Sequence, residues 1–366
     1  MFLTVSKRLE FSASRRLFLP NESNETNRRL FGAEASARYG AGRNYVVWFV
    51  FTGSVDPATG MLMNISEIKQ RAGAVINERY DHLFLNEDNA SFSDVVPTAE
   101  NVAQQLASDV APLFRGSGAE LRAVYLEETP EHGATAYSNG FVEAHHDFRF
   151  SAARTTRSPH LSAEENERLF GLAASPHGHG HDYSVRLTIR ANHSAESVAA
   201  VSVVEACIAG LMAELDHRNL NIEVSGLRDT PMTTEMIAAY IFRRAQADLP
   251  VERVRLHERA DFFAEFNRAG EHLLGMQVPF SAVHRLQSYE HSAEENTAMY
   301  GKCNNPAGHG HLYLAEATVG GKLDLRSGTL CDFGELRRVM GDSVADWNNR
   351  HLDLETEEFR RLPSTG

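Results

Sequence analysis

Three segments of the chain, "EFSASRRL", "RFSAARTT" and "PFSAVHRL", alternate apolar and polar residues in the way that predicts β-strands. Three longer segments, "NYVVWFVFTGSV", "DYSVRLTIRA" and "LYLAEATVGG", also predict strands. The stretches "NISEIKQRAGAVINERY" and "TAENVAQQLASDVAPLF" predict helices, and each "SAEEN" stretch predicts a short helix capped by its serine. The pattern indicates an α+β fold, in which a small antiparallel sheet carries two helices on one face.

These segments recur at a fixed spacing, which indicates an internal repeat. Each FSA segment is followed by "LFG" or "MYG" at the same distance and then by a tyrosine. The phenylalanines and tyrosines that mark the repeat are Phe11, Phe150 and Phe280 with Tyr45, Tyr183 and Tyr313. We therefore predict three tandem units, called unit 1 (residues 1–138), unit 2 (139–273) and unit 3 (274–366). Unit 3 ends at "LPSTG", where its second helix and last strands are expected, so we expect it to be truncated.

Composition excludes several classes of function. The chain has 366 residues, of which 42 % are hydrophobic, and a net charge of −13, so nucleic acid and membrane surfaces would repel it. Its three cysteines lack the spacing of a disulfide framework, and no apolar run is long enough for a signal peptide or a membrane span. We expect a cytoplasmic protein.

Unit 3 contains a candidate metal site. In "KCNNPAGHGHLY", His309 and His311 lie two apart on a predicted strand, so their side chains leave the same face. His284, in "FSAVHRL", lies on the neighbouring predicted strand and supplies a third imidazole. Three neutral imidazoles around Zn²⁺ leave a fourth position open, which is typical of a catalytic site. The alternative is three unrelated surface histidines in a chain that has 17.

These motifs carry a resemblance to a known family. Unit 3, with "FSAVHRL", "SAEEN" and "YGKCNNPAGHGHLY", resembles the 6-pyruvoyl-tetrahydropterin synthases, a family that includes the 6-carboxy-tetrahydropterin synthases of the queuosine pathway. "VDPATGMLMNISEIK" in unit 1 matches as well, and the likeness covers essentially the whole chain. It implies tunnelling-fold units whose sheets join in threes into a β-barrel, so that this chain would form a pseudo-trimer by itself. Paired rings in the family imply a homodimer of such chains.

The resemblance also implies roles for particular residues. His284, His309 and His311 would bind zinc and Cys303 would be the proton-abstracting base. An Asp–His pair and a pterin-anchoring glutamate are also part of the family pattern. The candidates for these roles are Asp81 with His82, Asp216 with His217, Glu128 and Glu258.

Units 1 and 2 depart from the pattern where unit 3 keeps it. The metal positions fall on Arg15, Ala41 and Arg43 in unit 1, and unit 2 keeps His179 and His181 but has Arg154 in place of the first ligand. A cation in the ligand shell repels zinc, so we expect no metal in unit 1 and weak binding at best in unit 2.

Unit 3 lacks the Asp–His pair in turn, because Asn348 and Asn349 stand in the aligned places, although Asp346 is available if the register slips. We therefore predict one composite site, in which unit 3 supplies zinc and thiol and a neighbouring unit supplies the Asp–His pair and the glutamate. The predicted function is a zinc-dependent lyase that converts 7,8-dihydroneopterin triphosphate to a 6-pyruvoyl- or 6-carboxy-tetrahydropterin, as in tetrahydrobiopterin or queuosine biosynthesis. The alternative is a non-catalytic pterin-binding or assembly protein.

Overall fold

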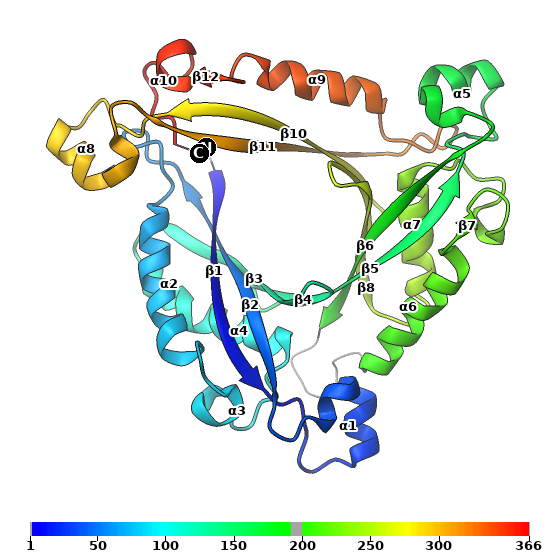
Figure 1. Cartoon of the computed structure of the whole chain (residues 1–366), viewed down its shortest axis with the longest axis horizontal. Helices are drawn as coiled ribbons and strands as arrows, with labels where there is room; N and C mark the ends of the chain where they lie inside the picture. Colours follow the sequence, from blue (N-terminus) through cyan, green and yellow to red (C-terminus); the bar gives the residue numbers. More distant parts are fainter. Residues whose placement is uncertain (1, 192–199, 366) are drawn as a thin grey trace.

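The computed structural model describes residues 2–191 and 200–365 and shows an α+β fold with one long antiparallel sheet. Its strands follow the order β1-β2-β3-β4-β5-β6-β8-β9-β10-β11, and the two-residue strands β7 and β12 pair in parallel with β5 and β10. Figure 1 shows the sheet along three sides of a triangle with the helices outside it. In the part of the chain that the structure describes, no helix is long and apolar enough to cross a membrane.

Units 1 and 2 share one order of main elements, and unit 3 repeats its first part. Unit 1 contains β1 (Phe2–Arg15), α1 (Asn24–Phe31), β2 (Ala41–Ser54), α2 (Ile65–Arg79), α3 (Leu85–Asp88), α4 (Ala99–Val110), β3 (Ala119–Thr129) and β4 (His132–Tyr137). Unit 2 contains β5 (Val142–Arg154), α5 (Ala163–Phe170), β6 (His179–Ala191), α6 (Val201–Leu215), β7 (Arg218–Asn219), α7 (Thr234–Ala245), β8 (Val251–Arg259) and β9 (Phe262–Asn267). Unit 3 contains β10 (His272–His284), α8 (Ala293–Tyr300), β11 (His309–Gly321), α9 (Phe333–Ala345), β12 (Arg350–His351) and α10 (Leu352–Glu355).

The markers of the repeat occupy equivalent places in space. The phenylalanine of each FSA segment stacks on the tyrosine of the following strand, with ring centroids 4.7, 4.8 and 4.9 Å apart in units 1, 2 and 3. Ser23, Ser162 and Ser292 cap the short helices α1, α5 and α8. In α5 and α8 a glutamate completes a capping box, as the "SAEEN" stretches suggest. The sequence analysis does not include β4 and its counterpart β9, the short strands that follow β3 and β8.

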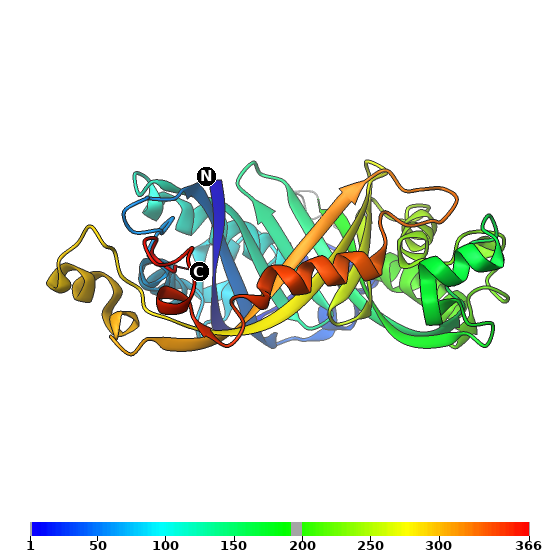
Figure 2. The ribbon, with the colours of Figure 1, turned by 90° about the horizontal axis from the view of Figure 1, so that it is seen from above.

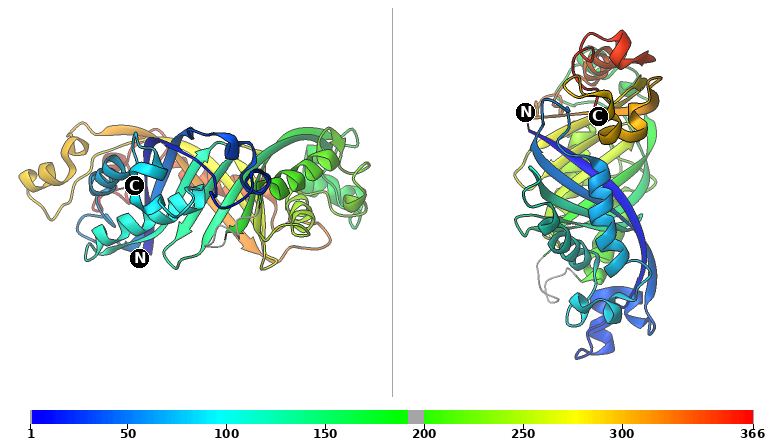
Figure 3. Two further views of the ribbon diagram at one scale, coloured as in Figure 1. Left: turned by 90° about the horizontal axis from the view of Figure 1, so that it is seen from below. Right: turned by 90° about the vertical axis from the view of Figure 1, so that its left-hand side faces the viewer.

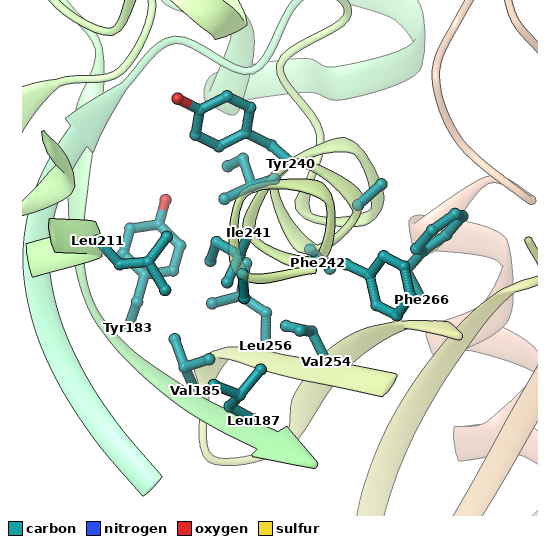
Figure 4. Close-up of a cluster of buried hydrophobic side chains, with 14 of the residues drawn as sticks. Tyr183, Val185, Leu187, Leu211, Tyr240, Ile241, Phe242, Val254, Leu256 and Phe266 are labelled. Atoms are coloured by element: carbon teal, nitrogen blue, oxygen red, sulfur yellow. The ribbon is translucent and has the colours of Figure 1, made fainter. Parts of the chain in front are cut away.

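Units 1 and 2 each bury a large core between the sheet and two helices. In unit 2 the alternating residues of β6, among them Tyr183, Val185 and Leu187, share a core with Ile241 of α7, and Leu256 of the neighbouring strand β8 lies beside Val185 (Figure 4). The same alternation in β2 faces α2 and α4 in unit 1. Burial of these apolar faces is the main source of stability for such layers.

Unit 3 has a much smaller core. Among the described residues it has α9 but no counterpart of α4 and α7, nor of the strand pairs β3–β4 and β8–β9. Its buried cluster consists of Phe280, Ala282, Val344 and Leu352, and β11 leaves Leu312 76 % exposed. Among the described strands, β11 pairs only with β10, so its other edge has no strand partner there.

Adjacent units meet at three junctions. At the junction of units 1 and 2, α1 packs against α6, and at that of units 2 and 3, Thr233 donates to the carbonyl of Gly328. At the junction of units 3 and 1, Ser288 and Tyr300 donate to the carbonyls of Ala58 and Thr59. Figures 2 and 3 show the resulting flat molecule from its sides. The hydrogen-bonded path of described strands still has two ends, β1 and β11, so closure of the barrel stays a prediction.

Candidate metal centre

Pairing of β10 with β11 brings the three histidines of unit 3 together. His284, the last residue of β10, lies opposite His309, the first residue of β11, and His311 lies opposite Ala282. One nitrogen from each ring can be chosen so that the three atoms lie within 4.8 Å of one another. Among the described residues this is the one group of three histidine, cysteine or carboxylate side chains close enough to share an ion. The three histidines expected on neighbouring strands therefore lie close together, in an arrangement consistent with a metal site.

The imidazole of His284 is oriented by a second contact. Its Nδ1 lies 2.6 Å from the carbonyl oxygen of Ser364, which can only accept, so Nδ1 carries the proton and Nε2 keeps its lone pair. That Nε2 is buried and has no hydrogen-bond partner among the described residues. A buried, unpaired nitrogen that faces two further imidazoles fits a metal ion, and imidazole is a preferred ligand of zinc.

The site is buried on one side and open on the other. His284 is 5 % exposed, His309 is half-buried and His311 is exposed. Burial lowers the pKa of His284 and of His309, and the neighbouring imidazoles lower them further, so both rings favour the neutral form that binds metal. The exposed side leaves room for a further ligand or substrate.

Cys303 lies in the short 3₁₀ turn between α8 and β11 (Gly301–Asn304). The turn is fastened to the end of β10, because Leu286 donates to the carbonyl of Cys303 and the Arg285 side chain donates to the carbonyl of Asn304. The thiol is half-buried and forms no hydrogen bond with the described residues. The backbone therefore holds the cysteine beside the strand that carries His284.

The corresponding positions of units 1 and 2 carry ion pairs. Arg154 lies opposite His179, as His284 lies opposite His309, and it is buried against Glu258 and Thr234. Arg15 lies opposite Ala41 and pairs with both Glu128 and Glu34, and Arg43 also pairs with Glu34. A guanidinium therefore stands where unit 3 places its first imidazole.

Glu128 and Glu258 are bound to the arginine of their own unit. Arg15 Nε lies 2.6 Å from Glu128, and the hydroxyl of Tyr45 donates to the same oxygen. Burial would raise the pKa of Glu128, but the charge of Arg15 outweighs it and the pKa is lowered. The same balance, with Arg154, lowers the pKa of Glu258. Neither carboxylate forms a hydrogen bond or ion pair with the triad within the described ranges.

The two Asp–His pairs have the same geometry in units 1 and 2. His82 Nδ1 lies 2.9 Å from Asp81, and His217 Nδ1 lies 2.9 Å from Asp216. Each aspartate accepts a hydrogen bond from the first strand of its own unit, and His82 is 83 % exposed. Within residues 2–191 and 200–365, neither histidine forms a hydrogen bond or ion pair with the triad.

Unit 3 has asparagines in these two places. Asn348 accepts a hydrogen bond from the backbone of Ser281, as the aspartates do in their own units. Asn349 has a φ of 59°, against 59° for His82 and 57° for His217, so the alignment without a register slip is confirmed. Asparagine tolerates this left-handed conformation better than most residues.

Sequence reasoning gave no role to a second His–Asp contact beside the triad. His351 pairs with Val283 in the short strand β12, and its Nδ1 lies 3.7 Å from Asp353. A Cβ at Gly308 would lie 2.9 Å from His351 Nε2, so the imidazole packs on the residue that precedes His309. Asp353 also accepts hydrogen bonds from the Arg285 backbone and the Ser364 hydroxyl. The signal in the sequence was "RHLD", where unit 2 reads "RNLN".

A family model described as 6-pyruvoyl tetrahydropterin synthase matches residues 4–139, 143–269 and 274–366. The human 6-pyruvoyl tetrahydrobiopterin synthase is 44 % identical over 99 residues, which cover 27 % of this chain and 68 % of the human protein. The 6-carboxy-5,6,7,8-tetrahydropterin synthase of Rickettsia felis is 26 % identical over 122 residues, which cover 29 % of this chain and 88 % of that protein. The structure of the Caenorhabditis elegans 6-pyruvoyl tetrahydropterin synthase matches with a TM-score of 0.33 and 25 % identity, covering 35 % of this chain and 95 % of that one.

Proposed function

The chain belongs to the 6-pyruvoyl tetrahydropterin synthase family, and from that premise we propose that it is a zinc-dependent lyase acting on 7,8-dihydroneopterin triphosphate. The observation that carries the proposal is the triad of unit 3, in which His284 Nε2 is buried without a partner and faces two imidazoles. The product is a 6-pyruvoyl- or a 6-carboxy-tetrahydropterin, because relatives of both names match the chain.

The roles of the side chains follow from their chemistry. His284, His309 and His311 would hold zinc, which acts when bound as a Lewis acid on the oxygens of the substrate side chain. Cys303, as thiolate, takes the proton from the adjacent carbon, and internal proton shifts then allow the triphosphate to leave, which gives the 6-pyruvoyl product. The 6-carboxy product additionally requires cleavage of the bond between the first and second side-chain carbons and loss of the two outer carbons. The thiol of Cys303 must pass the proton on to a second acid–base group.

We propose that this second group and the pterin anchor come from a neighbouring unit, in one composite site. Asp81 with His82, or Asp216 with His217, would receive the proton, and Glu128 or Glu258 would bind the 2-amino and N3–H donors of the pterin. Unit 3 has Asn348 and Asn349 in the aligned places, which supports the idea that an Asp–His pair must come from another unit. His351 with Asp353 is the rival within unit 3.

Elemental analysis and product analysis test the proposal together. The purified chain should hold about one zinc and convert the triphosphate to a tetrahydropterin, identified by mass spectrometry. His309→Ala should abolish both, because two imidazoles are too few for a stable zinc site. His179→Ala, at the same register position in unit 2, is the matched control and should leave both unchanged. Two or three zinc ions per wild-type chain would contradict the assignment of the metal to unit 3 alone.

The second candidate function is a non-catalytic pterin-binding or assembly protein. It is favoured by the ion pairs that occupy the metal positions of units 1 and 2. A chain without zinc and without product, which still binds pterin, would support it.

We also propose that two chains form a homodimer, as the paired rings of the family suggest. Light scattering of the intact chain would give about twice the mass of 40.6 kDa, and a stable hexamer of this chain would contradict the pseudo-trimer.

A further inference from the structure

A short segment of unit 3 links the metal triad to unit 1. The carbonyl oxygen of Ser364 accepts the Nδ1–H of His284 at 2.6 Å, and the hydroxyl of the next residue, Thr365, donates to the carbonyl of Gly60 at 2.6 Å. Gly60 lies in the loop between β2 and α2, so it belongs to unit 1. We call residues 363–365 the strap, because they contact a metal-site histidine on one side and the neighbouring unit on the other.

Within unit 3 the strap is fixed by hydrogen bonds to the residues around His284. The hydroxyl of Ser364 donates to Asp353 at 2.7 Å, and Asp353 also accepts from the backbone N–H of Arg285, the residue after His284. Ser364 is 3 % exposed, so these groups are shielded from water. The carbonyl that orients His284 is therefore held by Asp353 on one side and by the contact of Thr365 with unit 1 on the other.

The contact with unit 1 requires a glycine at position 60. Gly60 has a φ of 69°, in the left-handed region that favours glycine. A Cβ there would lie 2.7 Å from the hydroxyl oxygen of Thr365 and 3.0 Å from Cβ of Pro363, closer than side chains normally approach one another. A side chain at this position would therefore displace the strap from unit 1, and with it the carbonyl of Ser364.

The same contact occurs at the junction of units 2 and 3. Thr233 of unit 2 donates to the carbonyl of Gly328 of unit 3. Gly328 has a φ of 76°, and a Cβ there would lie 2.3 Å from Cβ of Pro231. Pro231 and Thr233 thus correspond to Pro363 and Thr365 of the strap, so the chain offers a matched pair of junctions.

The two junctions differ in the side chain that stands at the metal position. In unit 2 Arg154 takes the register of His284, and its guanidinium donates to the side chains of Thr234 and Glu258. In unit 3 the imidazole of His284 donates to the backbone of the strap. A change at each junction glycine therefore separates a general loosening of an interface from the release of a metal ligand.

A fixed carbonyl affects metal binding through the tautomer and orientation of the imidazole. With Nδ1–H bonded to the carbonyl of Ser364, the lone pair of His284 stays on Nε2, on a ring that faces His309 and His311. A ring without this acceptor can rotate and can carry its proton on either nitrogen. Loss of such an outer partner typically lowers metal affinity about 10- to 100-fold.

We propose that Gly60 of unit 1, acting through Thr365 and Ser364, is a positioning residue for His284, so that the junction of units 3 and 1 sets the metal affinity of the triad. The inference rests on the proposed function for its metal ion. It adds a contribution of unit 1 that is separate from the Asp–His pair and the glutamate of the composite site. Unit 1 thereby controls the metal occupancy of unit 3, although its own metal positions carry an ion pair.

Competition with a chromophoric zinc chelator, on the full chain, tests the inference. Gly60→Ala should weaken zinc binding about 10- to 100-fold, because the strap moves and His284 loses its orienting carbonyl. Gly328→Ala is the matched control, because it brings the same kind of clash to the junction of units 2 and 3, and it should change the zinc affinity less than about threefold. Equal weakening in both variants would show a general loosening of the fold, and no weakening in Gly60→Ala would show that the strap does not hold the ligand. Either result overturns the inference.

A milder pair of variants covers the case in which Gly60→Ala disturbs folding. Thr365→Val keeps the shape but removes the hydroxyl that donates to Gly60, and it should weaken zinc binding about 3- to 10-fold. Thr365→Ser restores the hydroxyl and should return the affinity to near the wild-type value. The visible absorption of bound Co²⁺ reports the ligand geometry, so its bands should shift or weaken in Thr365→Val and recover in Thr365→Ser. Unchanged bands and affinity in Thr365→Val would contradict the inference.

The two proposals can fail separately. Turnover by the wild-type chain, with a zinc affinity that Gly60→Ala leaves unchanged, keeps the lyase and removes the coupling between units. A zinc affinity that falls in Gly60→Ala, in a chain that forms no tetrahydropterin, does the reverse. A wild-type chain that binds neither Zn²⁺ nor Co²⁺ also overturns the coupling.

Discussion

Two regions of the molecule share one strand register but carry different side chains. They are the end of β1 with the start of β2 in unit 1, and the end of β10 with the start of β11 in unit 3. In unit 3, His284 faces His309, and the lone pairs of neutral imidazoles converge on a space that a cation fits. In unit 1, Arg15 faces Ala41, and its guanidinium lies between Glu34 and Glu128. The positive charge at the centre is thus supplied by the side chain itself.

Units 1 and 3 thus keep the same strand pairing at this place, while the side chains that could bind a metal in unit 3 are replaced by an ion pair in unit 1. Glu34 stands in the 3₁₀ turn that corresponds to the turn of Cys303 in unit 3, so an anion has taken the place of the thiol. The carboxylates of Glu34 and Glu128 are paired with the guanidinium of Arg15, a cation that belongs to the chain itself. Replacing a whole buried ion pair by apolar side chains is often neutral for stability, whereas removing one partner leaves an uncompensated buried charge.

The largest expected effect concerns the acid–base partner of Cys303. If a neighbouring unit lends it, either His82→Ala or His217→Ala should lower the turnover rate on the order of 100- to 10,000-fold, like Cys303→Ala, while the other stays near wild type. Asn349 cannot accept a proton at neutral pH, so unit 3 needs such a partner. Steady-state rates of the variants, with zinc content as the control, give the answer.

The contrary outcome is equally specific. If His82→Ala and His217→Ala both keep the wild-type turnover rate while His351→Ala lowers it, the acid–base partner of Cys303 lies within unit 3. The proposal of a site shared between units is then wrong. His351 packs against Gly308, the residue before His309, so its imidazole lies close enough to the metal site for such a role.

The next effect concerns the ion pair of unit 1. Arg15→Met should lower the free energy of unfolding by about 3–5 kcal/mol at pH 7, because it leaves the buried Glu128 charged and unpaired. Urea unfolding monitored by circular dichroism measures it. The double variant Arg15→Met with Glu128→Gln should recover most of the loss; no recovery would mean that Arg15 acts through packing alone.

The pH dependence of this loss has a defined sign. With Arg15 present, the pKa of Glu128 lies below the ordinary glutamate value of about 4.5, so its contribution to stability is present above that pH and fades as the pH falls below it. Without Arg15, burial favours the protonated carboxyl. The difference between the wild type and Arg15→Met should therefore shrink as the pH falls toward and below about 4.5.

The sequence predicted the repeat, the α+β class and the metal triad, because each rests on a local pattern. Strand alternation and a shared register place His284 opposite His309 without any knowledge of the tertiary packing. The ion pairs of Glu128 and Glu258 could not be predicted in the same way. They depend on the tertiary packing that brings Arg15 and Arg154 next to these carboxylates. The contact between His351 and Asp353 was also missed, because it depends on how β12 pairs with β10 and on the space that Gly308 leaves beside His351.

The smallest change that should convert one kind of site into the other lies in unit 2. His179 and His181 already occupy the places of His309 and His311, and Arg154 lies opposite His179 in the register of His284. Arg154→His removes the cation and supplies a third imidazole, so the zinc content should rise from about one to about two per chain. Glu258, left without its arginine, would lie beside the new ion and compensate its charge. Arg154→Gln removes the same charge without adding an imidazole and should leave the zinc content at about one.

The contrary outcome is a zinc content of about one per chain in both variants. In that case the strand register alone does not make a metal site, and the carbonyl of Ser364 that orients His284 in unit 3 is a necessary part of it.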